Sequence, residues 1–112
     1  MPETTFSFSI DPTPDVTYVR CSGKLVAGVT DQLYKPVREL IPTSKHIVVD
    51  MTNLASIDSM GLGTLVRLYV TATALGSDLH LMNVGKRVRE LLGVTNLISI
   101  LGIIGENGIR MP

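Results

Sequence analysis

An acid and a hydroxyl stand side by side in the stretch SIDSMGLGTLVRLY, residues 56–69, where a helix is expected to begin. An Asp58 or Ser59 side chain placed there accepts a hydrogen bond from a backbone N–H that has no other partner. The free N–H groups and the helix dipole also favour an anion, and a phosphate on a serine adds about −1.5 to −2 charges. Gly61 and Gly63 follow, although each glycine costs a helix roughly 1 kcal/mol relative to alanine. Something is therefore expected to come close to this backbone.

Two interpretations of this helix start remain open from the residues alone. Aspartate and serine are ordinary N-caps, and glycines near a helix start also serve tight packing within a protein. A functional site would instead use Ser59 as a reversible charge, with Gly61 and Gly63 where a partner approaches. Physical reasoning on these residues alone favours the packing interpretation.

The other reactive side chains form no catalytic set in the sequence. Cys21 lies in an expected strand without an evident base, so we predict a small core residue. His46 and His80 stand at expected strand edges with no cysteine or carboxylate at ligand spacing, which argues against a metal site. The GLG of residues 61–63 is not followed by the lysine and hydroxyl of a phosphate-binding loop. We expect neither an enzyme nor a cofactor.

A basic cluster, Lys86, Arg87 and Arg89, stands at the start of a short helix expected over residues 86–93. The helix dipole disfavours cations at that end. A solvated surface is the simpler interpretation, and an acidic partner or a phosphate-bearing ligand is the alternative.

The elements before Ser59 follow from hydrophobic periodicity. Residues 5–10 alternate as a half-buried strand does, and residues 16–25 predict a second strand antiparallel to it. Two prolines and two aspartates over residues 11–15 predict a turn without strand. A helix is expected over residues 30–41, and residues 46–51 are a β-branched run typical of a central strand.

Two details concern the helix of residues 30–41. Thr30 is the expected N-cap. Pro36 should kink this helix or mark its real beginning. Its buried face is predicted to carry Leu33, Val37, Leu40 and Ile41.

The helix that begins near Ser59 has an apolar stripe at core-facing spacing and ends at Gly76, a left-handed C-cap position. The stripe consists of Leu62, Leu65, Val66, Tyr69 and Ala72. Its outward edge would carry Met60, Gly63 or Thr64, and Arg67. Residues 79–82 and 97–101 are further strand candidates. Alternating strands and helices predict one α/β domain over residues 1–112, with a mostly parallel sheet of four to five strands, an antiparallel N-terminal strand and helices packed on it.

The order of these elements resembles the STAS domain of bacterial anti-sigma factor antagonists. The similarity runs from about residue 16 to residue 100 and centres on a strand, a short loop and the DSMGL of residues 58–62. The residues that carry it are Asp50, Ile57, Asp58, Ser59, Gly61, Leu62, Leu65, Gly76, Val88, Leu91, Leu92, Gly93 and Leu97.

The resemblance implies a function and a site. In that family the serine after the aspartate is phosphorylated by a partner kinase of the GHKL type that is also the anti-sigma factor, which makes Ser59 the acceptor. The unphosphorylated protein would bind the anti-sigma factor, release a sigma factor for transcription, and let go on phosphorylation. The implied partner-binding residues are Asp58, Ser59, Met60, Gly61, Gly63, Thr64 and Arg67.

Three departures from the family pattern concern this site. The chain has GKLV, with Lys24 and Val26, where members commonly have an acidic residue, which points to weak phosphorylation or a variant kinase. Met60 replaces a second hydroxyl and leaves Ser59 as the acceptor of the motif. The usual C-terminal amphipathic helix is hard to find in the glycine-rich tail.

The composition excludes some classes of binding partner and indicates the cellular compartment. Ten basic and ten acidic residues balance, and Trp is missing, which argues against direct binding of nucleic acid or of an anionic membrane. A single cysteine and the lack of a basic-then-apolar leader predict a cytoplasmic protein. The most apolar run, residues 97–105, is far shorter than the roughly 20 residues of a spanning helix.

Two other functions stay open beside the antagonist. One is a STAS ligand sensor, not an enzyme, that binds a nucleotide or small anion at the Ser59 helix start. The other is a piece of an anion-transporter tail, which the missing spanning segments disfavour. The oligomeric state is open.

Overall fold

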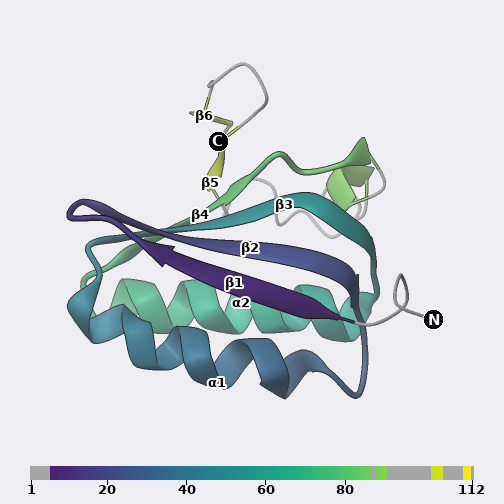
Figure 1. The fold of residues 1–112 in the computed structure, drawn as a ribbon, viewed down its shortest axis with the longest axis horizontal. Coiled ribbons are helices and arrows are strands. Elements are labelled where there is room, and N and C mark those ends of the chain that lie inside the picture. Colours follow the sequence, from purple (N-terminus) through teal and green to yellow (C-terminus); the bar gives the residue numbers. More distant parts are fainter. Residues whose placement is uncertain (1–5, 87, 91–101, 105–109, 112) are drawn as a thin grey trace.

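The computed structural model describes residues 6–86, 88–90, 102–104 and 110–111, and in it a sheet is covered on one side by two helices (Figure 1). The strands lie in chain order: β1 (Ser7–Pro12), β2 (Val16–Leu25), β3 (His46–Ile57), β4 (Asp78–Met82), β5 (Gly102–Ile104) and β6 (Arg110–Met111). The β2–β3, β3–β4 and β4–β5 pairs are parallel, whereas β1–β2 and β5–β6 are antiparallel. The predicted fold class is confirmed, with one strand more than expected.

Strand β1 shows the predicted alternation but runs further than predicted. Phe6 is buried, and Phe8 and Ile10 pack against the core, while the serines between them are exposed. The expectation that residues 11–15 contain no strand was wrong, because pairing continues to Pro12. Proline is tolerated on an edge strand, where a missing N–H costs no ladder hydrogen bond on the open side.

The first helix is α1 (Thr30–Leu40), followed by the 3-10 turn η2 (Ile41–Thr43). Thr30 is not its N-cap: Val29 holds that position without a side-chain hydrogen bond. Pro36 does not interrupt the helix either. Fully buried Leu33 and Val37 anchor it to the core on both sides of the proline, so tertiary packing outweighs the local cost of the ring.

Strand β3 is twice as long as the run of residues 46–51 that predicted it. Its register with β2 shifts between Arg20 and Ser22 and again between Gly23 and Lys24. Such bulges bend a strand and re-aim its end. The extension carries the chain to Ile57 beside Leu25, so that the start of the next helix lies against the end of β2.

The second helix, α2 (Ser59–Ala74), packs on the sheet beside α1 (Figure 1). Leu62, Leu65 and Ala72 are buried as predicted, and Leu68, which the predicted stripe omitted, is fully buried. Val66 and Tyr69 are only partly buried against the core. The chain leaves the helix through Gly76 at φ +81°, as predicted.

The chain after β4 is described in part. Residues 86 and 88–90 are helical, and the Arg89 N–H donates to the Gly85 carbonyl oxygen at 2.9 Å, in accord with the start of the helix predicted over residues 86–93. Arg87, the end of that helix and the strand predicted over residues 97–101 lie outside the described residues. Within the described part of the tail, residues 102–104 and 110–111 are strands.

Candidate functional site

Asp58 caps the start of α2 and ties it to the end of β2. One carboxylate oxygen accepts from the Gly61 N–H at 2.9 Å, and the other accepts from the Ala27 N–H at 3.0 Å. The Asp58 N–H in turn donates to the Leu25 carbonyl oxygen at 3.4 Å. Of the two N-cap candidates, the structure therefore selects Asp58.

These hydrogen bonds also set the charge of the cap. The backbone N–H of Ala27, followed by that of Gly61, holds the pKa of the Asp58 carboxyl below its usual range, because donors to a carboxylate favour its ionised form. The helix start thus already carries one negative charge at neutral pH.

Gly61 serves packing within the protein. A Cβ built on it would lie 2.1 Å from the Leu25 carbonyl oxygen and 2.8 Å from the Ile57 Cγ1. Its backbone is buried against β2 and does not face outward. For this glycine the packing interpretation is correct, and the close approach expected from the sequence is made by the end of β2.

Gly63 differs from Gly61 in its surroundings. A Cβ built there meets no atom within 4 Å among those that the structure describes. Of the alternatives Gly63 or Thr64, the structure puts Gly63 on the outer edge. Thr64 is buried at 3% exposure, and its hydroxyl donates to the Met60 carbonyl oxygen at 3.1 Å.

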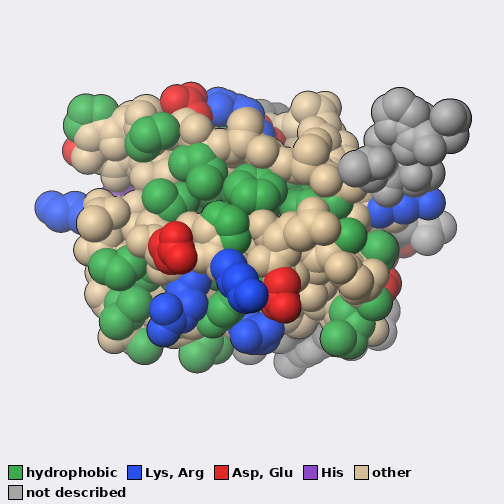
Figure 2. All heavy atoms as spheres, turned by 60° about the horizontal axis from the view of Figure 1, so that its bottom comes forward, with side chains coloured by type: hydrophobic (Ala, Val, Ile, Leu, Met, Phe, Trp, Pro, Cys, Tyr) green, Lys and Arg blue, Asp and Glu red, His purple; other side chains and the backbone are tan. Residues whose placement is uncertain are grey.

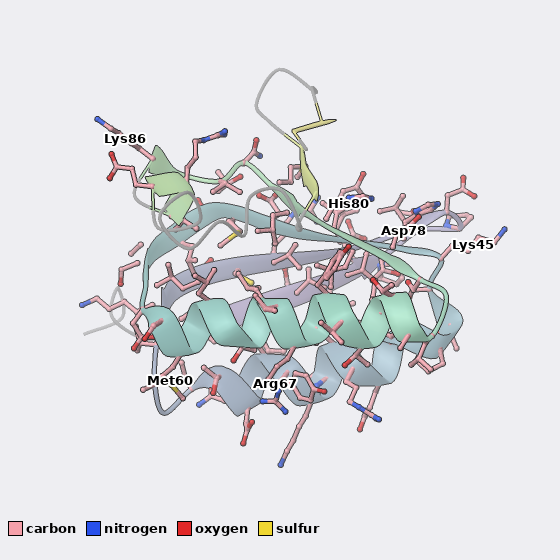
Figure 3. The ribbon with its side chains drawn as sticks, turned by 180° about the vertical axis from the view of Figure 1, so that it is seen from behind. Lys45, Met60, Arg67, Asp78, His80 and Lys86 are labelled. Carbon is pink, nitrogen blue, oxygen red and sulfur yellow. The ribbon has the colours of Figure 1, made fainter. Side chains whose placement is uncertain are left out.

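The outward side of the helix start presents four of the predicted partner-binding residues. Ser59 is exposed. Met60 is 59% exposed, and Arg67 is exposed two turns further along α2 (Figure 3). Gly63 lies between them. We call Ser59, Met60, Gly63 and Arg67 the α2 edge; Asp58 supports it from below, and Gly61 and Thr64 are turned inward.

Helix α1 contributes a residue that sequence reasoning missed. The Arg67 guanidinium carbon lies 4.0 Å from the centroid of the Tyr34 ring, a cation–π geometry. The Tyr34 hydroxyl lies 3.4 Å from the Thr71 Oγ1, and this hydrogen bond, more than nearby Arg67, lowers the pKa of Tyr34. An aromatic on the polar side of a predicted helix was the available signal, but nothing in the sequence pairs it with Arg67.

The helical side of the molecule is mixed in character beyond the α2 edge. Figure 2 shows Lys and Arg side chains next to Asp and Glu side chains on this side, with hydrophobic side chains around them. Exposed charges of α1 include Asp31, Lys35, Arg38 and Glu39. The surface therefore offers both signs of charge beside apolar Met60.

The cysteine behaves as predicted. Cys21 is 2% exposed, and burial, with a smaller contribution from Asp50, raises the pKa of its thiol to about 12. Such a thiol stays protonated at neutral pH and is a poor nucleophile.

Contrary to the expectation from the sequence, the two histidines have a carboxylate at ligand distance in the folded chain. An Asp78 carboxylate oxygen lies 3.3 Å from the His46 Nδ1, and ligand atoms of His46, Asp78 and His80 all lie within 4.8 Å of one another. The sequence separates His46 from Asp78 by more than thirty positions, but they are partners in the β3–β4 register.

Residues 7–107 of the chain match the STAS domain family. A curated relative, the anti-sigma F factor antagonist of Paenibacillus polymyxa, is 31% identical over 90 residues, which cover 79% of this chain and 77% of the relative.

Solved structures share the fold over most of the chain. The anti-sigma factor antagonist SpoIIAA in its unphosphorylated form has a TM-score of 0.75 at 19% identity over 90% of both chains. Its phosphorylated form, described for Bacillus, has a TM-score of 0.71 at 18% identity over 90% of this chain and 94% of that one. A sulfate transporter family protein from Wolinella succinogenes has a TM-score of 0.72 at 23% identity, over 86% of this chain and 82% of that one.

At such identities the structural likeness establishes the fold and does not separate these functions. Among the described residues, no helix is long and apolar enough to cross a membrane.

Proposed function

Because the chain belongs to the STAS domain family, we propose that it is an anti-sigma factor antagonist whose α2 edge binds an anti-sigma factor while Ser59 is unphosphorylated. The observation that carries the proposal is the exposed Ser59 at the first position of α2, beside the exposed Met60 side chain. The P. polymyxa relative, 31% identical, bears the same functional name. The protein acts by binding and is not an enzyme.

Phosphorylation of Ser59 ends the complex by adding charge where the partner docks. A phosphate contributes about −1.5 to −2 charges at neutral pH, next to the ionised Asp58. At an effective dielectric constant near 20, two like unit charges about 6 Å apart repel by roughly 3 kcal/mol. That energy corresponds to about a hundredfold in affinity, so an acidic group on the partner within this range suffices for release.

Ser59 is the hydroxyl of the helix start that a kinase can reach. Thr64, the next hydroxyl along α2, is buried and donates to a backbone carbonyl. Asp58 cannot leave its two backbone donors without uncapping the helix. The modification therefore adds a group to an exposed side chain and leaves the cap in place.

The kinase is the anti-sigma factor itself, of the GHKL type, and the setting is cytoplasmic control of sigma-factor-dependent transcription. Lys24 is exposed and Val26 half-buried immediately before Ala27, whose N–H binds Asp58. The residues that replace the acid of other members thus lie beside the acceptor helix. A kinase that recognises this protein must accept a cation or an apolar group there.

The experiment combines the purified chain, an anti-sigma F factor and ATP. Intact-mass spectrometry is expected to find one phosphate on the wild type and none on Ser59→Ala. Ser59→Asp should bind the anti-sigma factor at least tenfold more weakly than Ser59→Ala, measured by calorimetry without ATP. A phosphate on Ser59→Ala, or equal binding by the two variants, contradicts the proposal.

A ligand sensor is the competing function, and the cap argues against it. The Gly61 N–H that would receive an anion already binds the Asp58 carboxylate, and a second anion beside that ionised group is repelled. Calorimetry of ATP, GTP and inorganic phosphate against Ser59→Ala tests this point. Saturable heats of binding, together with NMR chemical-shift changes at residues 58–63, favour the sensor.

A further inference from the structure

At the opposite end of β3 from Ser59, two histidines and an aspartate gather on adjacent strands. His46 is the first residue of β3, and Asp78 and His80 belong to the start of β4. Ligand atoms of all three side chains lie within 4.8 Å of one another. In Figure 3, Asp78 and His80 lie toward one side of the molecule, and Met60 lies at the start of α2 on the other side.

The strand register explains why these side chains share a face. His46 pairs with Asp78, and Val48 pairs with His80, in a parallel ladder. Successive side chains of a strand point to opposite faces. Ile47 and Leu79 are buried in the core beneath the helices, so their neighbours His46, Asp78 and His80 project from the other face.

The backbone around the cluster is held firmly. The Ser77 hydroxyl donates to the Ser44 carbonyl oxygen at 2.6 Å and lies 3.1 Å from that of Lys45. The Asp78 N–H donates to the Lys45 carbonyl oxygen at 2.8 Å. Both strands therefore begin from one clamped corner, and ligand binding requires little ordering of the backbone.

The three side chains differ in solvent exposure, with His80 the most buried and Asp78 the most exposed. His80 is 9% exposed, whereas the side chains of His46 and Asp78 are 45% and 65% exposed. The outer pair of side chains is exposed and has room to rotate, whereas the inner ring is buried. A tetrahedral zinc ion with bonds of about 2.0–2.2 Å needs its donors roughly 3.3–3.6 Å apart, so the ligand atoms, now within 4.8 Å of one another, need only a small approach.

We propose that His46, Asp78 and His80 form a binding site for Zn²⁺. Two imidazoles and a carboxylate are a donor set that zinc accepts, with a water completing the tetrahedron. The exposed Lys45 side chain is directed outward into solvent (Figure 3). A bound ion would link the first residues of two neighbouring strands and stabilise the folded chain.

This site is independent of the proposed partner binding. It uses both histidines of the chain and none of the residues of the α2 edge. Failure of the zinc site would leave the antagonist function untouched, and the reverse also holds.

Calorimetry of Zn²⁺ into the full chain, without an affinity tag and freed of metal with EDTA, tests the proposal. One equivalent is expected to bind with a dissociation constant in the micromolar range and to raise the melting temperature by several degrees. His46→Gln and Asp78→Asn should each weaken binding by about tenfold or more.

Two matched variants control for nonspecific effects. Asp15→Asn makes the same change as Asp78→Asn on an exposed residue of the β1–β2 turn and should leave the affinity unchanged. Lys45→Gln removes a neighbouring charge without removing a ligand and should not weaken binding.

Histidine ¹⁵N NMR gives a second measurement that does not depend on any variant. Because the chain has two histidines, both imidazoles are expected to shift together at one equivalent of Zn²⁺. The proposal is overturned if Zn²⁺ binding does not saturate below millimolar concentrations, if His46→Gln and Asp78→Asn bind as the wild type does, or if one ring alone responds.

Discussion

Replacing Gly61 by alanine should separate two elements that the fold brings into backbone contact. The added Cβ would lie 2.1 Å from the Leu25 carbonyl oxygen and 2.9 Å from its carbonyl carbon. Both atoms belong to the backbone at the end of β2, so no side-chain rotation relieves the clash. The start of α2 must move away from β2 by about 0.9 Å merely to reach the 3.0 Å limit below which Cβ contacts are essentially never seen.

The magnitude follows from the contacts that this movement disturbs. Overpacking of a tight site costs about 1–3 kcal/mol, and loss of the hydrogen bond from the Asp58 N–H to Leu25 costs about 1 kcal/mol more. Alanine returns about 1 kcal/mol through its higher helix propensity. The free energy of unfolding of Gly61→Ala should therefore fall by about 1–3 kcal/mol.

Gly63→Ala is the matched control, because it makes the same chemical change two residues along the same helix. Its Cβ meets no described atom within 4 Å, so the propensity term stands alone and the free energy of unfolding should rise by up to about 1 kcal/mol. The two variants are then expected to differ by about 1–4 kcal/mol.

Urea unfolding followed by far-ultraviolet circular dichroism measures both, since the chain has no tryptophan for fluorescence. A Gly61→Ala variant as stable as the wild type would refute the close approach of α2 to β2. Equal losses in the two variants would assign the effect to the helix start in general and not to Leu25.

Three further outcomes are expected. Asp58→Asn keeps one acceptor oxygen, whereas the carboxylate uses two. The folded state lowers the pKa of Asp58. The stabilisation by the ionised carboxylate is therefore complete above the pKa of the unfolded state and is lost as the pH falls through the pKa of the folded state. The difference in unfolding free energy between the wild type and Asp58→Asn should thus be largest above about pH 5 and shrink below about pH 4 in acid urea titrations. Cys21, whose thiol pKa is raised to about 12, should react with Ellman's reagent at pH 8 only when urea unfolds the chain; rapid reaction of the native protein would contradict its burial. Arg67→Ala should lower stability by no more than about 1 kcal/mol, from loss of the contact with Tyr34, yet weaken anti-sigma factor binding in calorimetry several-fold more than Lys35→Ala on α1.

Local sequence patterns predicted the structure correctly where a feature depends on one strand or helix alone. The alternation from Phe6 to Ile10 and the left-handed exit at Gly76 depend on neighbours in sequence, and both are found in the structure. The prediction that Pro36 would kink α1 or mark its beginning was wrong, because buried Leu33 and Val37 anchor the helix on both sides of the proline. Thr64 was an alternative for the outward edge of α2, but it is buried. Its hydroxyl donates a hydrogen bond within the helix, so a polar residue is buried there at little cost.

Features that depend on strand register were out of reach. The sequence marks no bulge in β3, so the strand was expected to stop near residue 51 rather than reach Ile57. The pairing of His46 with Asp78 could not be predicted either, because the register between β3 and β4 is not evident from the sequence. For Gly61, spacing predicted that something approaches the backbone, but only the bulged path of β3 makes that neighbour Leu25.

The rigid construction of the helix start determines how a phosphate on Ser59 would act. Both Asp58 oxygens accept from backbone donors, one in α2 and one in the loop that follows β2, and the Gly61 backbone packs directly against the Leu25 carbonyl. A new negative charge on exposed Ser59 therefore cannot be absorbed by re-forming the cap or shifting the helix at low cost. Its repulsion would be directed outward, toward a partner that covers Met60 and Gly63, and we expect it to lower the affinity for that partner without changing the fold.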